Sequence, residues 1–588
     1  MKNLFASFGD SFKKALYLFR IQLSFGWEGV FTQFLYIFML TVKKIIPVLL
    51  PKFIIDACTG KQLSAFVIVL ISFSAFSWIV DSTIGITEWV QTVYNLKFAH
   101  YFKRRISAKA MTMDYKDLED SEALDGLERA MDAAYYGLSD TLFSELFLHI
   151  LLLIFLFFTV STLNFPVALV TLAVVLLLYF INRKATEVNH DFEMQKSPLR
   201  RQREYAENCM LDFGTAKDIR ANDAQNMFLS KFADASEAEI EVRKKQNRYN
   251  LGIGTLKTVL NALMIFGMYA YLIRSYSDGL VAISSFTVYL AALYEFYGAV
   301  EGLFGCLLSF RESAVNLAEI DGILGRTETI TKDGKPTEES VRSIEFKNVT
   351  FTYPGQSEPA IRGLNLFIDA KDSTILVGEN GAGKTTLIKL LLRLYDVDSG
   401  AILVNGTDIR ELSYPEYIAH FAPVFQEVWL FAYSVKENIA FSDAADADKM
   451  REALDFAGIA EYIGKLPDGI DTFCTKNFDE NGVNFSGGEQ QKLTIARAVW
   501  RCADVVIMDE PNSALDALSE SRLSENMRAL AESKLLLLIS HRLSMSRFCN
   551  HIVVLDNGEI IEEGTHTELM NKNGRYAEMY NMQSLQYK

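Results

Sequence analysis

Hydrophobic and polar positions divide the chain into two parts with different patterns. Before about residue 310, long apolar runs of roughly bilayer length recur between polar stretches. After that point, short apolar runs alternate with charged, turn-rich segments. The long runs predict six membrane-crossing helices, near residues 28–54, 64–92, 141–162, 165–182, 252–273 and 280–308. The pattern therefore predicts a multi-domain membrane protein with an all-α transmembrane domain, residues 1–320, followed by a soluble part.

Lysine and arginine positions predict the orientation of these helices. The segments after the second and fourth helices are long and basic, whereas the loops near 56–63, 163–165 and 275–279 are short and nearly free of basic residues. Basic loops remain on the cytoplasmic side, so we expect both termini in the cytoplasm. The two basic segments stay helix-like past the membrane, and each is expected to end in a short docking element. The amino-terminal stretch, without a small-residue cleavage site, predicts an interfacial helix that remains on the chain.

Composition argues against several classes of site. The formal net charge of −15 disfavours nucleic acid as a partner, because a polyanion usually requires a basic surface. The seven histidines show no HExxH or other metal-ligand spacing. The cysteines have no CxxC spacing or nearby histidines, and they are interpreted as reduced thiols: Cys58, Cys209, Cys306, Cys474, Cys502 and Cys549.

The soluble part begins after a polar stretch that we interpret as a linker, residues 321–342, and extends over residues 343–588. SIEFKNVTFTY alternates as a strand does. STILVGENGAGKTTLIKLLLRLY then combines a β-branched apolar run, a glycine loop and an amphipathic helix, in which Gly378, Gly383, Lys384 and Thr385 satisfy the P-loop pattern GxxxxGK[ST]. Glycines allow backbone N–H groups to approach phosphate oxygens, the lysine reaches the β- and γ-phosphates, and the threonine offers a hydroxyl to Mg²⁺. This context predicts a nucleotide-binding α/β P-loop NTPase domain.

A second group of polar residues follows predicted strands farther along the chain. ADVVIMDEP delivers Asp509 to a strand end as a Mg²⁺-associated carboxylate, and Glu510 follows it, placed to orient or deprotonate the attacking water. His541 follows the apolar run LLLLIS, where an imidazole can reach the γ-phosphate. VNFSGGEQQK places a glycine pair at a helix start, which is a second anion site, so we expect its phosphate to belong to a second copy of the chain.

The order of these motifs resembles the ATP-binding cassette (ABC) family. The matching positions are Tyr353, the P-loop, Gln426, Ser486-Gly487-Gly488, Asp509-Glu510, Ser513-Ala514-Leu515-Asp516 and His541. The preceding helices resemble the fused half-transporters of the family's exporter branch. The resemblance implies ATP and Mg²⁺ as cofactors and an ATPase domain with a helical subdomain. It implies that Tyr353 stacks on adenine, that Gln426 senses the γ-phosphate and Mg²⁺, and that DYKDLEDSEALDG and TAKDIRANDAQN match coupling helices.

The resemblance also assigns the site residues. The implied catalytic residues are Glu510, His541 and Gln426, and the implied Mg²⁺ ligands are Thr385, Gln426 and Asp509. The implied nucleotide-binding residues are Tyr353, Gly378, Asn380, Gly381, Gly383, Lys384, Thr385, Thr386, Ser486, Gly487, Gly488 and Asp516.

The partner implied by the resemblance is a second half-transporter chain. We favour a homodimer because symmetric dimers are the commonest assembly, but Phe485 and Glu489 depart from the usual LSGGQ signature. A weakened signature also fits a heterodimer, in which this chain, with Glu510 and His541 intact, is the catalytically competent member.

The function implied is ATP-driven export of an amphipathic or hydrophobic cargo, drug-like or peptide, across the plasma (inner) membrane by alternating access. The alternatives are a lipid flippase and an ATP-gated channel or regulatory subunit; Glu510 and His541 favour turnover over gating.

Two lysines, Lys43 and Lys44, interrupt the first apolar run, where an unpaired ammonium costs at least a few kcal/mol. One explanation is a structural ion pair inside the helix bundle. The other is that a lysine lines a water-filled cavity and binds an anionic group of the cargo. Candidate partners on the other helices are Asp81, Glu88, Glu145, His149, Glu295 and Glu301.

Overall fold

The structure is a computed structural model of the chain. It describes residues 2–60, 63–137, 142–161, 165–279, 282–328, 330, 334–337, 340–442, 445–512 and 516–586. Ser513, Ala514 and Leu515 of the motif order therefore lie outside the described residues. The chain forms two compact units, the first made of Met1–Met111 and Asp125–Gly325 and the second of Thr112–Leu124 and Arg326–Lys588.

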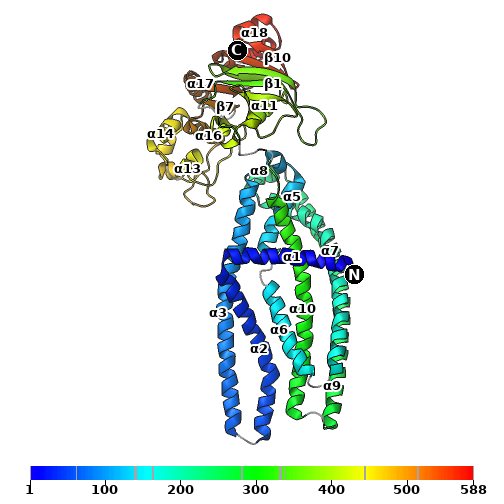
Figure 1. The fold of residues 1–588 in the computed structure, drawn as a ribbon. Coiled ribbons are helices and arrows are strands. Elements are labelled where there is room, and N and C mark those ends of the chain that lie inside the picture. Colours follow the sequence, from blue (N-terminus) through cyan, green and yellow to red (C-terminus); the bar gives the residue numbers. More distant parts are fainter. Residues whose placement is uncertain are drawn as a thin grey trace. The chain divides into compact units, whose positions relative to one another are not determined.

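The first unit is helical throughout its described residues (Figure 1). Its elements are α1 (Lys2–Phe25), α2 (Trp27–Thr59), α3 (Leu63–Ala110), α5 (Ser121–Asp132) from Asp125 onward, the π-helix η1 (Ala133–Gly137), α6 (Leu142–Ser161), α7 (Phe165–Leu211), α8 (Phe213–Ala221), α9 (Gln225–Ser277) and α10 (Ile283–Leu324). The amino-terminal stretch is the helix α1, which crosses the long helices of this unit in Figure 1.

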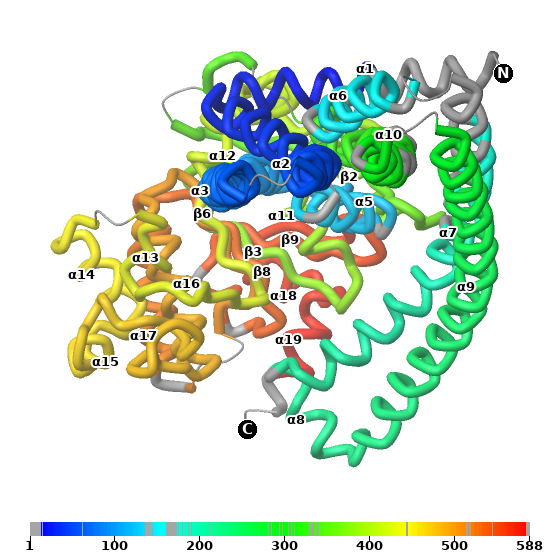
Figure 2. The backbone as a smooth tube through the Cα atoms, turned by 90° about the horizontal axis from the view of Figure 1, so that it is seen from below, coloured from blue at the N-terminus to red at the C-terminus, as the bar shows by residue number. Residues whose placement is uncertain are grey.

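The apolar runs of the sequence fall on α2, α3, α6, α7, α9 and α10. Among the described residues, α2, α3 and α9 are long and apolar enough to cross a membrane, and α6 contains a shorter apolar stretch, Glu145–Thr159. The helices α7 and α9 run side by side well beyond their apolar parts (Figure 2), and the short helix α8 lies between them in the chain. The expected long helical extension with a short terminal element is thus present in this part of the chain.

Buried side chains hold the helices of the first unit together in separate clusters. One cluster joins α2, α6, α9 and α10 through residues such as Val48, Leu152, Leu272 and Phe296. Between α2 and α3, the ammonium of Lys43 lies 2.7 Å from a carboxylate oxygen of Asp81. The ion pair expected for Lys43 is therefore present with Asp81 as the partner, but the two side chains are about half exposed within the chain and not enclosed by the bundle. Cargo binding by a lysine stays a prediction.

The second unit combines strands and helices. Its strands are β1 (Ser343–Phe351), β2 (Ile361–Asp369), β3 (Ser373–Gly378), β4 (Ser399–Val404), β5 (Thr407–Asp408), β6 (Phe421–Val424), β7 (Val505–Asp509), β8 (Leu535–Ile539), β9 (His551–Asp556) and β10 (Glu559–Gly564). Its helices are α4 (Tyr115–Leu118), α11 (Lys384–Leu391), η2 (Ile409–Glu411), α12 (Tyr414–Ala419), α13 (Val435–Ala440), α14 (Ala447–Phe456), α15 (Ala460–Gly464), η3 (Gly469–Asp471), α16 (Gly487–Arg501), α17 (Ala517–Ala531), η4 (Leu543–Phe548), α18 (His566–Lys572) and α19 (Arg575–Gln586).

Two sheets form among the described residues of this unit. A four-stranded antiparallel sheet has the order β2-β1-β4-β5, and a six-stranded sheet has the order β10-β9-β3-β8-β7-β6. In the larger sheet, β3, β6, β7, β8 and β9 are parallel and β10 is antiparallel at one edge. The α/β class predicted for the soluble part is confirmed.

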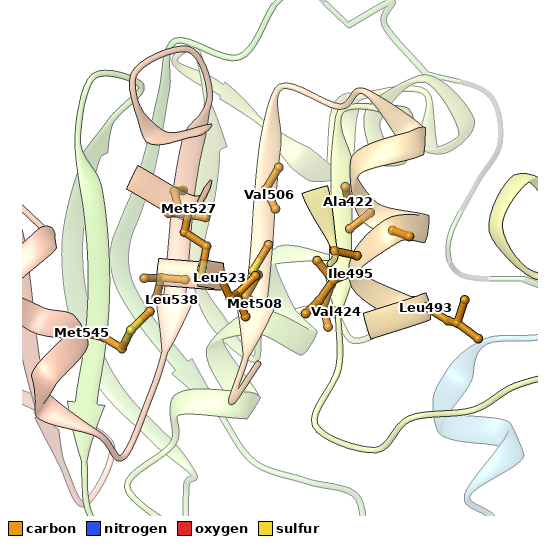
Figure 3. Close-up of a cluster of buried hydrophobic side chains, with 14 of the residues drawn as sticks. Ala422, Val424, Leu493, Ile495, Val506, Met508, Leu523, Met527, Leu538 and Met545 are labelled. Carbon is orange, nitrogen blue, oxygen red and sulfur yellow. The ribbon is translucent and has the colours of Figure 1, made fainter. Parts of the chain in front are cut away.

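The larger sheet is buried on both faces, as expected for apolar strands without polar alternation. Val506, Met508 and Leu538 face one layer, in which Leu493 and Ile495 of α16 and Leu523 and Met527 of α17 also pack (Figure 3). The alternate positions Val505, Ile507 and Leu537 face the other layer, with α11 and the four-stranded sheet. Because successive strand residues point to opposite faces, each central strand contributes to both cores.

The register of the parallel strands brings together the loops that follow β3, β7 and β8. Leu376 of β3 and Asp509 of β7 both pair with Ile539 of β8. Neighbouring parallel strands therefore end at the same edge, where ligands of open α/β sheets bind.

Candidate functional site

The P-loop follows β3 and turns into α11 at Gly383. This glycine caps the helix with φ 101°, in the left-handed region, and a Cβ here would lie 2.7 Å from Ile361 Cδ1. Lys384 is buried at the first helical position, and its ammonium donates hydrogen bonds of 2.8 Å to the carbonyls of Gly378 and Glu379. Burial lowers the pKa of Lys384, while Glu510 and Asp509 act in the opposite direction. The strand–loop–helix arrangement with the lysine at the helix start is the one that the motif predicts, and phosphate binding by it stays a prediction.

A hydroxyl and a carboxylate meet beside this loop. Thr385 donates from Oγ1 to Asp509 Oδ2 over 3.1 Å. Asp509 ends the buried strand β7, and burial raises the pKa of its carboxyl group, opposed by the hydrogen bond from Thr385. Hydroxyl and carboxylate oxygens suit Mg²⁺ when phosphate oxygens complete its shell. The donor set therefore fits the predicted cation, although the described residues contain no cluster of three or more His, Cys, Asp or Glu that would hold a metal by themselves.

Glu510 lies between the side chains of two other loops. His541 Nε2 is 2.7 Å from Glu510 Oε1, and Gln426 donates from Nε2 to Glu510 Oε2 over 3.1 Å. Glu510 itself has φ 49°, a left-handed conformation that is uncommon for a residue with a side chain. Strained backbone of this kind clusters at functional sites. The structure thus brings the three predicted catalytic residues into one hydrogen-bonded group.

Tyr353 lies beside the helix that follows the P-loop. Its hydroxyl is 3.1 Å from the Thr386 hydroxyl, and its ring contacts Tyr395 edge-on, with centroids 5.5 Å apart. The ammonium of Lys389 is 5.3 Å from the centroid of the Tyr353 ring. An aromatic ring at this place is available for a base, and the stacking role remains a prediction.

The signature residues start α16, with Ser486 as the N-cap and Gly487 and Gly488 in its first turn. The Ser486 hydroxyl donates to Glu489 Oε2 over 2.8 Å, and the backbone N–H of Ser486 donates to the same oxygen over 2.7 Å. The carboxylate of Glu489 is therefore part of a capping box. Phe485 is buried in the core beside Tyr462, which explains why a large apolar residue is accepted there.

The remaining predicted residues occupy loops and helix starts. Asn380 and Gly381 are exposed in the P-loop, where Gly381 has φ 84°. Asp516 accepts hydrogen bonds at the start of α17, from the Ser519 N–H over 3.0 Å and from the Ser519 hydroxyl over 2.7 Å.

A short segment from between α3 and α5 packs on the ATPase fold as part of the second unit. Glu119 accepts a hydrogen bond from the Tyr395 hydroxyl and lies 3.8 Å from the Lys389 ammonium. Tyr115 meets the Tyr395 ring edge-on, with centroids 5.6 Å apart. Burial and the contact with Glu119 raise the pKa of Tyr395. The segment expected to be a docking element, DYKDLEDSEALDG, therefore contacts the ATPase fold through Tyr115 and Glu119 in its first half.

Sequence reasoning missed a side chain that supports Glu510 from α16. Gln491 is buried, and its amide donates to the backbone carbonyl of Glu510 over 2.9 Å. It stands three residues after Gly488, so its place next to the signature was the available signal. Through Gln491, the helix that begins with the signature is bonded to the backbone of Glu510 in the same chain.

The chain is similar to known proteins in sequence and in fold. Residues 361–513 match the family model described as ABC transporter. The chain is 34% identical over 330 residues to proteins named ATP-dependent lipid A-core flippase from Salmonella typhimurium and Escherichia coli. Each alignment covers 56% of this chain and 56% of the relative, so the chain spans about half the length of the curated relatives it matches.

The fold has a counterpart among solved structures. A bacterial Atm1-family ABC exporter with ATP bound superimposes with a TM-score of 0.79 and 22% identity, covering 95% of this chain and 98% of the other. At this identity the likeness concerns the fold.

Proposed function

We propose that the chain is an ABC exporter half-transporter that hydrolyses ATP to export an amphipathic or hydrophobic molecule, on the basis of the family match in the ATPase domain, the similarity to the flippases and the exporter fold. The observation that carries this proposal is the group formed by Glu510, His541 and Gln426 at the end of the P-loop sheet. A carboxylate held by two partners favours repeated ATP hydrolysis, as an exporter needs. An ATP-gated channel or regulatory subunit needs only slow hydrolysis.

Each residue of the group has a distinct task in this proposal. Lys384 and the P-loop amides bind the β- and γ-phosphates, and Tyr353 offers its ring to adenine. Glu510 orients the attacking water and accepts its proton, while His541 and Gln426 hold the carboxylate in place. Thr385 and Asp509 would hold Mg²⁺, which neutralises developing charge on the phosphate oxygens when bound.

The proposed assembly is a dimer of half-transporters, because Ser486 and the glycines at the start of α16 offer a second helix N-terminus for phosphate besides the P-loop, and a second copy of the chain can supply that phosphate. We favour a homodimer; a heterodimer in which this chain supplies the competent catalytic residues is the alternative.

We further propose a plasma (inner) membrane location with both termini and the ATPase domain in the cytoplasm, as the positions of basic residues predict. Lipid translocation is the second candidate function, favoured by the name of the flippases to which the chain is similar.

A probe panel distinguishes these cargo classes. Inside-out vesicles containing the chain receive Hoechst 33342, a fluorescent amphipathic peptide or a fluorescent phosphatidylethanolamine, with ATP and with a non-hydrolysable analogue. ATP-dependent accumulation of the dye or peptide supports export, and movement of the labelled lipid alone supports the flippase. ATP hydrolysis without movement of any probe contradicts export of these classes.

A further inference from the structure

The helix α19 lies against the loop that carries His541. The side-chain amide of Gln583 donates from Nε2 to the backbone carbonyl of His541 over 2.5 Å, and its Oε1 accepts the backbone N–H of Leu543 over 2.9 Å. One side chain therefore binds the backbone on both sides of Arg542. None of the motifs that predict the site includes Gln583.

The position of α19 does not depend on Gln583. Glu562 of β10 accepts the first amides of the helix, from Arg575 over 2.7 Å and from Tyr576 over 3.0 Å. Tyr576 is fully buried, and its hydroxyl is 2.6 Å from the Ser546 hydroxyl and 2.7 Å from His566 Nδ1. These contacts tie the helix to η4 and α18, so that Gln583 projects from a fixed element.

Tight packing at the start of α19 supports the same conclusion. A Cβ at Gly574 would lie 1.9 Å from Glu562 Oε1. A larger residue at position 574 would therefore displace the carboxylate that caps the helix. The guanidinium of Arg575 also forms an ion pair with Glu379 in the P-loop. The same helix thus contacts both the P-loop and the loop of His541.

The contact between His541 and Glu510 makes the backbone position of His541 important. Nε2 of the imidazole lies 2.7 Å from the Glu510 carboxylate, and the two groups interact only while this distance stays within hydrogen-bond range. A misplacement of about 1 Å in an active site can cost about a hundredfold in rate. A side chain that fixes the backbone on each side of this loop acts on that distance without touching the nucleotide.

We propose that Gln583 is a positioning residue for ATP hydrolysis, holding the His541 loop so that the imidazole meets the Glu510 carboxylate. The inference rests on the proposed function, because it requires that His541 and Glu510 act on ATP.

The test uses the full chain in lipid nanodiscs and measures steady-state ATP hydrolysis. Gln583→Leu keeps the approximate size and removes both hydrogen bonds, so kcat is expected to fall about tenfold while KM for MgATP changes less than twofold. Gln583→Glu retains the acceptor for Leu543 and loses the donor to His541, and is expected to lower kcat similarly. Met582→Leu, at an exposed position of the same helix, is the matched control and should keep the parental kcat.

A double-variant cycle separates positioning from general destabilisation. In a His541→Ala background, Gln583→Leu should have no further effect on the residual kcat, because its target is already absent. An equal tenfold loss in that background would overturn the inference, and so would a parental kcat for Gln583→Leu alongside an inactive Glu510→Gln variant. Parental activity of Glu510→Gln would instead overturn the proposed function on which the inference rests.

Discussion

The ion pair between Lys43 and Asp81 gives a test of the membrane half that depends on magnitude. It joins α2 and α3, which are both long and apolar enough to cross a membrane, with 2.7 Å between the charged atoms. At 1.5 Å per residue, each side chain lies about 25 Å from the hairpin that joins the two helices. A hydrocarbon core of about 30 Å therefore includes both charges.

The cost of removing one partner depends on the surroundings. The side chains are 54% and 47% exposed within the chain, so a membrane or a second half-transporter determines their environment. In water, an exposed pair of this kind contributes at most about 1 kcal/mol. A single charge left at the centre of a membrane-spanning helix costs about 3 kcal/mol, and the cost falls toward either end of the helix, so 3 kcal/mol is the upper value at this depth. We therefore expect Lys43→Met to lower the stability of the membrane unit by about 1 to 3 kcal/mol, or about 2 to 6 °C in the unfolding midpoint.

The assay is thermal unfolding of the full chain in lipid nanodiscs at one scan rate. Lys43→Met and Asp81→Asn should each lower the midpoint, and the double variant should recover most of the loss because no unpaired charge remains. Lys335→Met is the matched control: its ammonium lies 2.6 Å from Glu411, the side chains are 67% and 54% exposed, and the pair lies in the ATPase unit. If Lys43→Met shifts the midpoint no more than Lys335→Met does, the reasoning is refuted.

The remaining predictions concern the nucleotide. Lys384→Ala should raise the Kd for a fluorescent ATP analogue at least about tenfold, because a charge-assisted contact with phosphate is lost; an unchanged Kd would contradict the assigned contact. Tyr353→Ala should raise KM for ATP about tenfold with kcat within twofold, since stacking on a base contributes to binding; a loss confined to kcat would contradict stacking. Glu489→Gln keeps the hydrogen bonds to Ser486 and removes a charge, so KM should fall about threefold in chain purified alone, by relief of repulsion with phosphate; absence of ATPase activity in that chain would favour a heterodimer.

Local patterns were sufficient to predict most of the helices and strands and to select residues that the structure brings close together. The apolar runs fall on long helices because a segment in lipid has no water to bind its backbone N–H and C=O groups, and a helix pairs these groups within the segment. β3 and β7 are recognisable as buried apolar runs, and the polar residues after them meet because parallel strands end together. Lys384, Thr385, Asp509, Glu510, His541 and Gln426 are accordingly found in contact with one another or with neighbouring loops.

Contacts between residues far apart in the sequence were not predictable. Gln491 and Gln583 support the site through backbone carbonyls, and a glutamine at one position carries no pattern that reveals its partner. The left-handed φ of Glu510 depends on its bond to the Ile539 carbonyl, which exists only once β7 and β8 are paired. The partner of Lys43 had several candidates, because the sequence does not specify how α2 and α3 rotate against each other.

The most direct test of the central claim is the rate of ATP hydrolysis by Glu510→Gln in lipid nanodiscs. Glutamine keeps the approximate shape of the side chain but only one acceptor oxygen, so it can accept from Gln426 or from His541 but not from both. It cannot accept the proton of the attacking water. Because a general base contributes at least about a hundredfold, kcat should fall by that factor while the Kd for ATP stays within twofold of the parental value. Hydrolysis at the parental rate would contradict the role of Glu510 and the ATP-driven transport built on it.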